Sequence, residues 1–222
     1  MPGLLCQPQN SLLAALPADV MERLGPNLER VQMAAATVLF EPGAPVRAAY
    51  FPESAVVAMS FALVNGSSAE VALIGHEGMV GVRLLLGESS MNVRASVQTA
   101  GTGLRLPAAC LLQEVGRGGA LMQVLLHYTG AYIGQIVQTA ASNRHGSVEQ
   151  RLCRWLLQSL DRVSGSELTM THESIAQALG VKREGITEAA GKLRDLGAIR
   201  YQRGHIEVLD RSLLESHVGE FY

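Results

Sequence analysis

Three adjacent charged residues, Lys182, Arg183 and Glu184, open a helical pattern late in the sequence. Their side chains carry the groups that read base pairs. An arginine can donate two hydrogen bonds to O6 and N7 of guanine, and a glutamate can accept one from N4 of cytosine. Further polar residues follow in the same pattern and in the hairpin after it. The candidate DNA-contacting residues are Lys182, Arg183, Glu184, Thr187, Glu188, Lys192 and Arg203.

Two predicted helices position these side chains. Residues 171–180 predict a short helix with Thr171 as its N-cap and Gly180 as its stop, and residues 181–196 predict a second helix. Two helices joined by a turn of about three to four residues with glycine are typical of a helix-turn-helix, whose second helix enters the major groove of DNA. Residues 198–209 then predict a hairpin, which makes the unit a winged helix-turn-helix.

The charge of this segment differs from that of the whole chain. Residues 182–203 carry six lysines and arginines against three acidic residues and are net +3, whereas the chain has 18 basic and 20 acidic residues and is net −2. A local excess of positive charge is the feature expected where DNA phosphates approach a protein. The plain alternative is a solvated helix face followed by an ordinary hairpin.

The composition restricts the classes of protein to consider. Of the 222 residues, 48% are hydrophobic, which is enough for a packed core and argues against a disordered chain. The three cysteines lie far apart, which favours a reducing compartment over a disulfide framework. The first residues do not resemble a signal peptide, and no apolar run reaches the roughly 20 residues that span a bilayer. We therefore expect a cytoplasmic protein without a membrane partner.

Residues 1–117 have the pattern of a small all-β domain, with short apolar runs separated by turn residues about every 8–12 positions. The clearest feature is a hairpin around Asn65-Gly66, a pair that favours a type I′ turn. A helix capped by Ser11 is expected over residues 11–24, and Gly101 and Gly103 are expected to bracket a bend. Strands are expected over residues 56–64, 67–74, 92–99 and 102–106.

Residues 118–142 predict one long apolar helix without a single Lys, Arg, Asp or Glu. Apolar positions on one side recur with alternating spacings of four and three residues. Such a helix must be buried on more than one side, either within one subunit or against a second copy of the chain, and we favour the second copy. Residues 143–147 predict a break that acts as a hinge. The predicted dimer seam comprises Met122, Leu126, Thr129, Ile133, Ile136 and Ala140.

With these elements in place, the sequence resembles the Crp/Fnr family of bacterial transcription regulators, through a hinge segment at residues 142–152 and a recognition segment at residues 179–188. The resemblance implies an α+β fold. An N-terminal double-stranded β-helix (a jelly-roll β-roll) would form a sensor over residues 1–117, a dimerisation helix would follow over 118–142, and a winged helix-turn-helix DNA-binding domain would cover 143–222. It also implies a homodimer on a palindromic site of double-stranded DNA, with RNA polymerase as a further partner of an activator.

The resemblance also implies which residues read bases. Arg183 and Glu184 occupy positions that the family uses for this purpose, whereas Glu188 stands where the best-known member has an arginine. We therefore expect a different half-site. Operator sequence, regulated genes and the choice between activation and repression all stay open at this point.

The cyclic-nucleotide pocket of the family is altered in this sequence. The family holds the nucleotide with a Gly-Glu and an Arg-Ser pair, which here read Gly81-Val82 and Ser89-Ser90. A buried phosphate needs a guanidinium, and only Ser90 and Arg94 remain nearby. We expect control through the β-roll by an unidentified effector and predict no cofactor. Cyclic AMP, cyclic di-GMP, a small hydrophobic effector and no ligand at all stay open.

Two other classes of protein have to be weighed. A metal-dependent enzyme on such a barrel needs converging histidines and carboxylates, but the six histidines are scattered singly and no catalytic motif is present. His76 stands alone in a glycine-containing turn, so we predict neither a metal site nor haem. A protein-interaction module that uses the winged helix is the other alternative, and it predicts that Arg183→Ala leaves DNA affinity unchanged.

Overall fold

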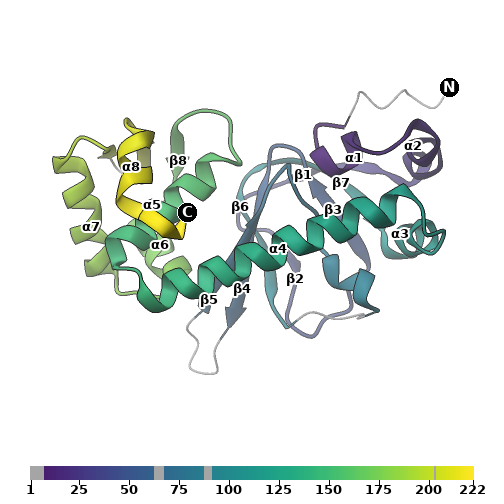
Figure 1. The fold of residues 1–222 in the computed structure, drawn as a ribbon, viewed down its shortest axis with the longest axis horizontal. Coiled ribbons are helices and arrows are strands. Elements are labelled where there is room, and N and C mark those ends of the chain that lie inside the picture. Colours follow the sequence, from purple (N-terminus) through teal and green to yellow (C-terminus); the bar gives the residue numbers. More distant parts are fainter. Residues whose placement is uncertain (1–7, 63–67, 88–91, 203) are drawn as a thin grey trace. The chain divides into compact units, whose positions relative to one another are not determined.

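The computed structural model describes residues 8–62, 68–87, 92–202 and 204–222. It combines helices with antiparallel strands, which confirms the expected α+β class (Figure 1). Several residues singled out from the sequence lie outside the described ones: Asn65, Gly66, Ser89, Ser90 and Arg203.

The chain forms two compact units. One consists of Met1–Met59 and Ile74–Ile133, and the other of Ser60–Leu73 and Gly134–Tyr222. Three elements are continuous from one unit into the other. They are the strands β4 (Val56–Ala62) and β5 (Ser68–Ile74) and the helix α4 (Ala120–His145).

Antiparallel strands build the core of the first unit, since side chains that alternate along a strand bury one face of a sheet. One sheet has the order β1-β7-β3, and the other has the order β2-β6-β4-β5. In the central strand β7, Leu104 lies opposite Phe51 of β3, and both side chains are buried. The other strands are β1 (Glu29–Met33), β2 (Val38–Phe40), β3 (Ala48–Pro52), β6 (Arg94–Thr99) and β7 (Gly101–Pro107).

Gly101 and Gly103 lie inside β7 rather than around a bend. A Cβ atom at Gly101 would stand 2.4 Å from the backbone nitrogen of Ala55, so only glycine fits this close approach. The two glycines therefore serve strand packing.

The N-terminal helix differs from the prediction. The expected single helix over residues 11–24 is wrong, because the chain forms two helices on either side of Pro17. Proline lacks the amide N–H and disfavours a helical residue before it. The N-cap of the first helix is Asn10 rather than Ser11. The Asn10 side chain accepts hydrogen bonds from two backbone amides in the first turn of the helix. The helices of the first unit are α1 (Ser11–Ala14), α2 (Ala18–Leu24), η1 (Gly25–Asn27), η2 (Val82–Leu86) and α3 (Ala108–Val115).

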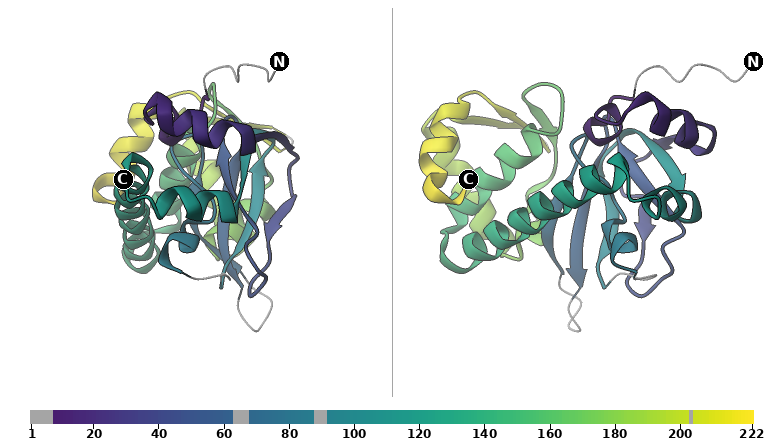
Figure 2. Two further views of the ribbon diagram at one scale, coloured as in Figure 1. Left: turned by 90° about the vertical axis from the view of Figure 1, so that its right-hand side faces the viewer. Right: turned by 45° about the vertical axis from the view of Figure 1, so that its right-hand side comes forward.

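Helix α4 has 26 residues, and the right view of Figure 2 shows it as one continuous helix. It extends through Asn143 to His145, so the expected break over residues 143–147 is wrong in its first part. The interruption is confined to Gly146 and Ser147. A Cβ atom at Gly146 would stand 2.7 Å from the carbonyl oxygen of Ser142, which explains a glycine at this point.

The second unit is built on helix α5 (Val148–Leu160) and a small sheet of order β8-β10-β9. Its core includes Trp155, Leu156, Ile186, Leu193 and Ile206. A C-terminal helix that the sequence analysis did not predict, α8, packs on α5. The remaining elements are β8 (Glu167–Thr169), α6 (His172–Leu179), α7 (Arg183–Asp195), β9 (Ile199–Gln202), β10 (His205–Val208), α8 (Arg211–Val218) and η3 (Gly219–Phe221).

Candidate nucleic-acid interface

Helix α6 lies between the predicted caps Thr171 and Gly180, whereas α7 (Arg183–Asp195) begins two residues later and ends one residue earlier than the predicted helix over residues 181–196. Thr171 is the N-cap of α6, and its hydroxyl accepts a hydrogen bond from the Ser174 amide at 3.1 Å. Gly180 ends α6 in the left-handed conformation, with φ +61°, which favours glycine. Lys182 is the N-cap residue of α7. The buried faces of the two helices consist of Ile175, Ala176 and Leu179, and of Ile186, Ala189, Ala190 and Leu193.

The other side of α7 carries the predicted DNA-contacting residues. All six that the structure describes are exposed, whereas the three apolar residues between them, Ile186, Ala189 and Ala190, are buried. Side chains three and four positions apart share one face of a helix, so most of these polar groups point away from the core together. The exposed residues are Lys182, Arg183, Glu184, Thr187, Glu188 and Lys192.

Ion pairs concentrate the positive charge of this region at the start of α7. Lys192 Nζ lies 3.0 Å from Glu188 Oε1, and this hydrogen bond raises the pKa of Lys192. Arg194 and Arg200 likewise have carboxylate partners, Asp195 and Glu207, at 2.8 and 2.5 Å. In the part of the chain that the structure describes, no carboxylate forms a salt bridge with Lys182 or Arg183. These two cations also adjoin the positive end of the helix dipole.

His172 of α6 contacts both α7 and strand β9, a role that its sequence context does not predict. Its ring stacks on Tyr201 of β9, with centroids 4.1 Å apart. Its Nδ1 lies 3.1 Å from Thr187 Oγ1, and the Thr187 hydroxyl donates to the Arg183 carbonyl at 3.1 Å. A hydroxyl has one proton to donate, so Nδ1 is the donor in the first bond. Burial and the positive Arg183 lower the pKa of His172, which keeps it neutral.

The predicted dimer seam is only partly exposed on α4. Leu126, Ile133 and Ala140 are exposed, with exposed fractions of 54% for Leu126 and 55% for Ile133. The other three predicted residues, Met122, Thr129 and Ile136, are half-buried.

An exposed apolar residue outside the prediction, Val137, is 61% exposed on the same helix. Leu126, Ile133, Val137 and Ala140 recur every three to seven positions and form what we call the α4 stripe. Gly130 lies between the first two, and a Cβ atom there would meet nothing within 4 Å.

Three of the predicted effector residues are described by the structure: Gly81, Val82 and Arg94. None of the three offers a guanidinium group without an acidic partner. Gly81 has φ +107° and precedes η2, and the Val82 side chain is buried. Arg94 is at the surface, where its Nε lies 3.0 Å from Glu41 Oε2. The charge of Arg94 is thus already balanced by a carboxylate.

Two features of the described residues bear on other functions. No three His, Cys, Asp or Glu side chains among them are placed to hold a metal ion. No helix in the described part of the chain is both long and apolar enough to cross a membrane.

Two family models match the sequence and do not overlap. Residues 30–117 match the cyclic nucleotide-binding domain, and residues 150–217 match the Crp-like helix-turn-helix domain. No curated protein sequence matches the chain.

Solved structures of similar fold cover most of the chain. FixK2 from Bradyrhizobium japonicum has a TM-score of 0.74 and 16% identity, covering 86% of this chain and 98% of that one. The c-di-GMP responsive global regulator CLP from Xanthomonas campestris has a TM-score of 0.71 and 17% identity. The match covers 87% of this chain and 100% of that one. A Crp/Fnr-family transcriptional regulator from Thermus thermophilus has a TM-score of 0.69 and 22% identity, with 86% and 98% covered.

Proposed function

Because this chain belongs to the Crp/Fnr family of transcription regulators, we propose that it binds a palindromic DNA site as a homodimer and reads it with α7. The observation that carries the proposal is the exposed pair Lys182 and Arg183 at the start of a helix whose opposite side is buried; neither cation forms a salt bridge with a carboxylate in the described part of the chain. RNA polymerase is the further partner if the bound protein activates transcription, the cytoplasm is its expected location, and no catalytic role is proposed.

Each polar group of α7 has a role that follows from its chemistry. Arg183 donates two hydrogen bonds to a guanine, and Glu184 accepts one from a cytosine amino group. Lys182 contacts phosphates together with the amides at the start of the helix, as does Arg203 of the wing. The hydrogen bond with His172 holds the Thr187 side chain in place on the exposed side of α7, where it would face the major groove. The candidates Glu188 and Lys192 form a pair, so they present a nearly neutral unit to the bases.

The α4 stripe is the proposed dimer interface. Its apolar side chains gain stability only when a second surface covers them, since each exposed large side chain costs free energy in water. Gly130 and Gly134 leave room beside the stripe for a second helix. Two copies related by a twofold axis place their recognition helices about 34 Å apart, one turn of DNA.

The proposed effector is a small molecule that acts through the β-sheets of the first unit. Gly81, Val82 and Arg94 leave the nucleotide phosphate without an arginine partner, because Arg94 is paired with Glu41. Cyclic AMP and cyclic di-GMP are the first two compounds to test. The second is chosen because a solved structure of this fold is that of a c-di-GMP responsive regulator.

The experiment is selection of binding sites from a random duplex pool at fixed salt, with the native protein, Arg183→Ala and Arg105→Ala. Arg105 is a surface arginine of β7, paired with Glu29, and serves as a control for the loss of one charge. We expect the native protein and Arg105→Ala to enrich the same palindrome. Arg183→Ala should weaken binding about 10- to 100-fold and relax one position of each half-site.

The rival classes give different results in the same experiment. An interaction module that does not read DNA enriches no sequence in any of the three proteins, with or without either cyclic nucleotide. DNA reading by other residues leaves Arg183→Ala with the native preference. Specific binding must also weaken steeply as salt increases, because phosphate contacts release counterions.

A further inference from the structure

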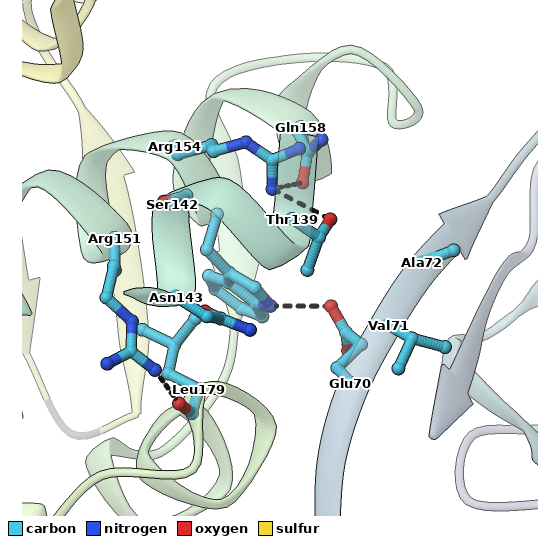
Figure 3. A pocket seen from close by; sticks show the side chains of 11 residues that line it. Glu70, Val71, Ala72, Thr139, Ser142, Asn143, Arg151, Arg154, Gln158 and Leu179 are labelled. Atoms are coloured by element: carbon cyan, nitrogen blue, oxygen red, sulfur yellow. Dashed lines mark hydrogen bonds between the residues drawn. The ribbon is translucent and has the colours of Figure 1, made fainter. Parts of the chain in front are cut away.

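The end of the β4–β5 hairpin contacts helix α5 through Glu70, within the second compact unit. Glu70 points from β5 toward α5, and its Oε1 accepts a hydrogen bond from the indole Nε1 of Trp155 at 3.1 Å (Figure 3). Farther along β5, the Leu73 carbonyl accepts a hydrogen bond from Gln135 Nε2 of α4 at 3.1 Å. The strand is therefore attached to two helices of this unit by side-chain hydrogen bonds.

The surroundings of Glu70 are rich in buried donors. A cavity of about 20 Å³ beside it has room for one water molecule, and Glu70 has the only carboxyl group among the described residues that line it. Arg154 is 5% exposed and donates from Nη1 to Thr139 Oγ1 at 3.2 Å and to Gln158 Oε1 at 3.1 Å. Its Nη2 and the Arg151 Nε are buried without a partner in the described part of the chain. A carboxyl group is the acceptor that such a site requires.

Trp155 connects this contact to the recognition helix. Its side chain is 3% exposed and shares one core with Ile186 and Leu193 of α7. Helix α5 packs on both α6 and α7, so Trp155 and the helix-turn-helix share one packed core. Strand β5 continues from Glu70 to Ile74, and Ile74 belongs to the first unit. A movement along β5 therefore reaches α5 through Glu70.

We propose that Glu70 is a positioning residue, whose hydrogen bond to Trp155 couples strand β5 to helix α5 and thereby to the DNA-reading helix α7. The inference rests on the proposed DNA binding and adds to it the side chain through which the β-sheet acts on the reader. Glu70 contacts no DNA in this proposal, and its loss changes affinity without changing which sequence is preferred.

Protonation of the Glu70 carboxyl should change the fluorescence of Trp155. A residue that only packs against Trp155 would give no such pH-dependent change. Burial raises the pKa of Glu70 to about 8, against the lowering effects of the Trp155 hydrogen bond and of Arg162 and Arg154. The charged groups facing it are Arg151 and Arg154 of α5 and Arg162 just after α5, whereas the lining residues of α4 and α6 are uncharged. Since Trp155 is the only tryptophan of the sequence, its fluorescence reports the ionisation of Glu70 directly.

The test compares the native full-length protein with Glu70→Ala, Glu70→Gln and Glu220→Ala. Glutamine keeps an acceptor for the indole but does not titrate, alanine removes the acceptor, and Glu220 is an exposed glutamate of η3 in the same unit. Two quantities are measured for each: tryptophan emission from pH 6 to about 9.5, and affinity for the selected DNA site. Circular dichroism melting establishes that each variant is folded.

We expect an emission change centred near pH 8 in the native protein and in Glu220→Ala, and none in Glu70→Gln. Glu70→Ala should bind the selected site about tenfold more weakly with the same sequence preference, and Glu70→Gln should recover most of that affinity. Native affinity in Glu70→Ala, or an emission change that survives in Glu70→Gln, overturns the proposal. If Glu70→Ala does not fold, Trp155→Phe, which removes the donor and keeps an aromatic ring, replaces it in the binding assay.

Failure of the proposed function is distinguishable from failure of this inference. A native protein that binds no DNA contradicts the function. The emission titration then still decides whether Glu70 and Trp155 are in contact, and its absence in the native protein contradicts the inference alone.

Discussion

His172 and Tyr201 show that single side chains on three elements cooperate at the candidate DNA interface. The imidazole stacks on the wing residue Tyr201 and donates to Thr187 on the recognition helix. A neutral ring suits this position, because a protonated one would place a second positive charge close to Arg183. The residue therefore links the geometry of the interface to pH.

We expect the native protein to lose stability in acid relative to His172→Phe. The folded protein lowers the pKa of His172, so the unfolded chain takes up the proton first as the pH falls below the ordinary value of about 6.5. The contribution of His172 is complete above that pH and declines below it. Urea unfolding at pH 7.5 and 5.5 measures the effect. Equal pH dependence in the two proteins contradicts it, and Glu70, which is present in both, cancels from the comparison.

The cysteines Cys110 and Cys153 should differ in reactivity. Cys153 is fully buried, and burial raises the pKa of its thiol to about 12, whereas Cys110 is half-buried on α3. Only the thiolate reacts with alkylating reagents. We expect Cys153 to stay unmodified by iodoacetamide at pH 8 until the protein is unfolded by urea. Peptide mass mapping measures this, and modification of Cys153 in the folded protein at the rate of Cys110 would be the contrary result.

At the scale of elements, helix α5 depends on a local signal and a long-range one. Its start is specified by a capping box, in which Ser147 accepts from the Gln150 amide and Gln150 Oε1 accepts from the Ser147 amide. The long-range contact comes from the other end of the chain, where the Phe221 carbonyl accepts a hydrogen bond from the Arg154 Nε at 2.8 Å. The first contact orders the helix start just after the interruption at Gly146, and the second attaches the C-terminus.

Ser147→Ala should lower the free energy of unfolding by about 1 kcal/mol, because the Gln150 amide in the first turn of α5 loses its acceptor, the Ser147 hydroxyl. Ser147→Asp retains an acceptor at the N-cap and should remain within a few tenths of a kcal/mol of the native protein. Thermal or urea denaturation followed by circular dichroism measures both. Equal destabilisation by the two substitutions would mean that the cap does not stabilise this helix.

At the scale of the whole molecule, the exposed α4 stripe and the distribution of charge point to assembly on DNA. The chain is net −2, so its attraction to phosphates is local to the winged domain and not a property of its overall charge. A single winged domain makes few contacts, and a second copy on the same DNA doubles them without a new type of contact. We therefore expect dimerisation to matter for affinity as much as any single base contact does.

Ile133→Asp should convert the dimer to a monomer, since it places a carboxylate in the apolar stripe. Leu112→Asp is the matched control, because Leu112 is 43% exposed on α3, away from the stripe. Analytical ultracentrifugation measures the mass, and the affinity for the selected palindrome should fall at least about tenfold in Ile133→Asp only. A monomeric native protein, or a dimeric Ile133→Asp, would exclude the α4 stripe as the interface.

Much of the DNA-binding domain was predictable from the sequence, because its signals are local. Thr171, Gly180 and the spacing of Ile186, Ala189, Ala190 and Leu193 determine where α6 and α7 start and stop and which side of α7 is buried. The interruption at Pro17 was also present in the sequence, although the analysis assigned one helix across it. Caps, turns and helical periodicity act within a few residues of one another, so the sequence displays them directly.

The tertiary structure alone decided which side chains meet over long distances. Glu70 and Trp155 are 85 residues apart, and nothing in the pattern around either one indicates the other. The same holds for the stacking of His172 on Tyr201 and for the side of α4 that stays exposed. The periodicity of the sequence determines which side chains share one face of a helix. Which other segment packs on that face depends on the tertiary fold. Local sequence therefore determined the reading helix, and the packing of distant segments determined what positions it.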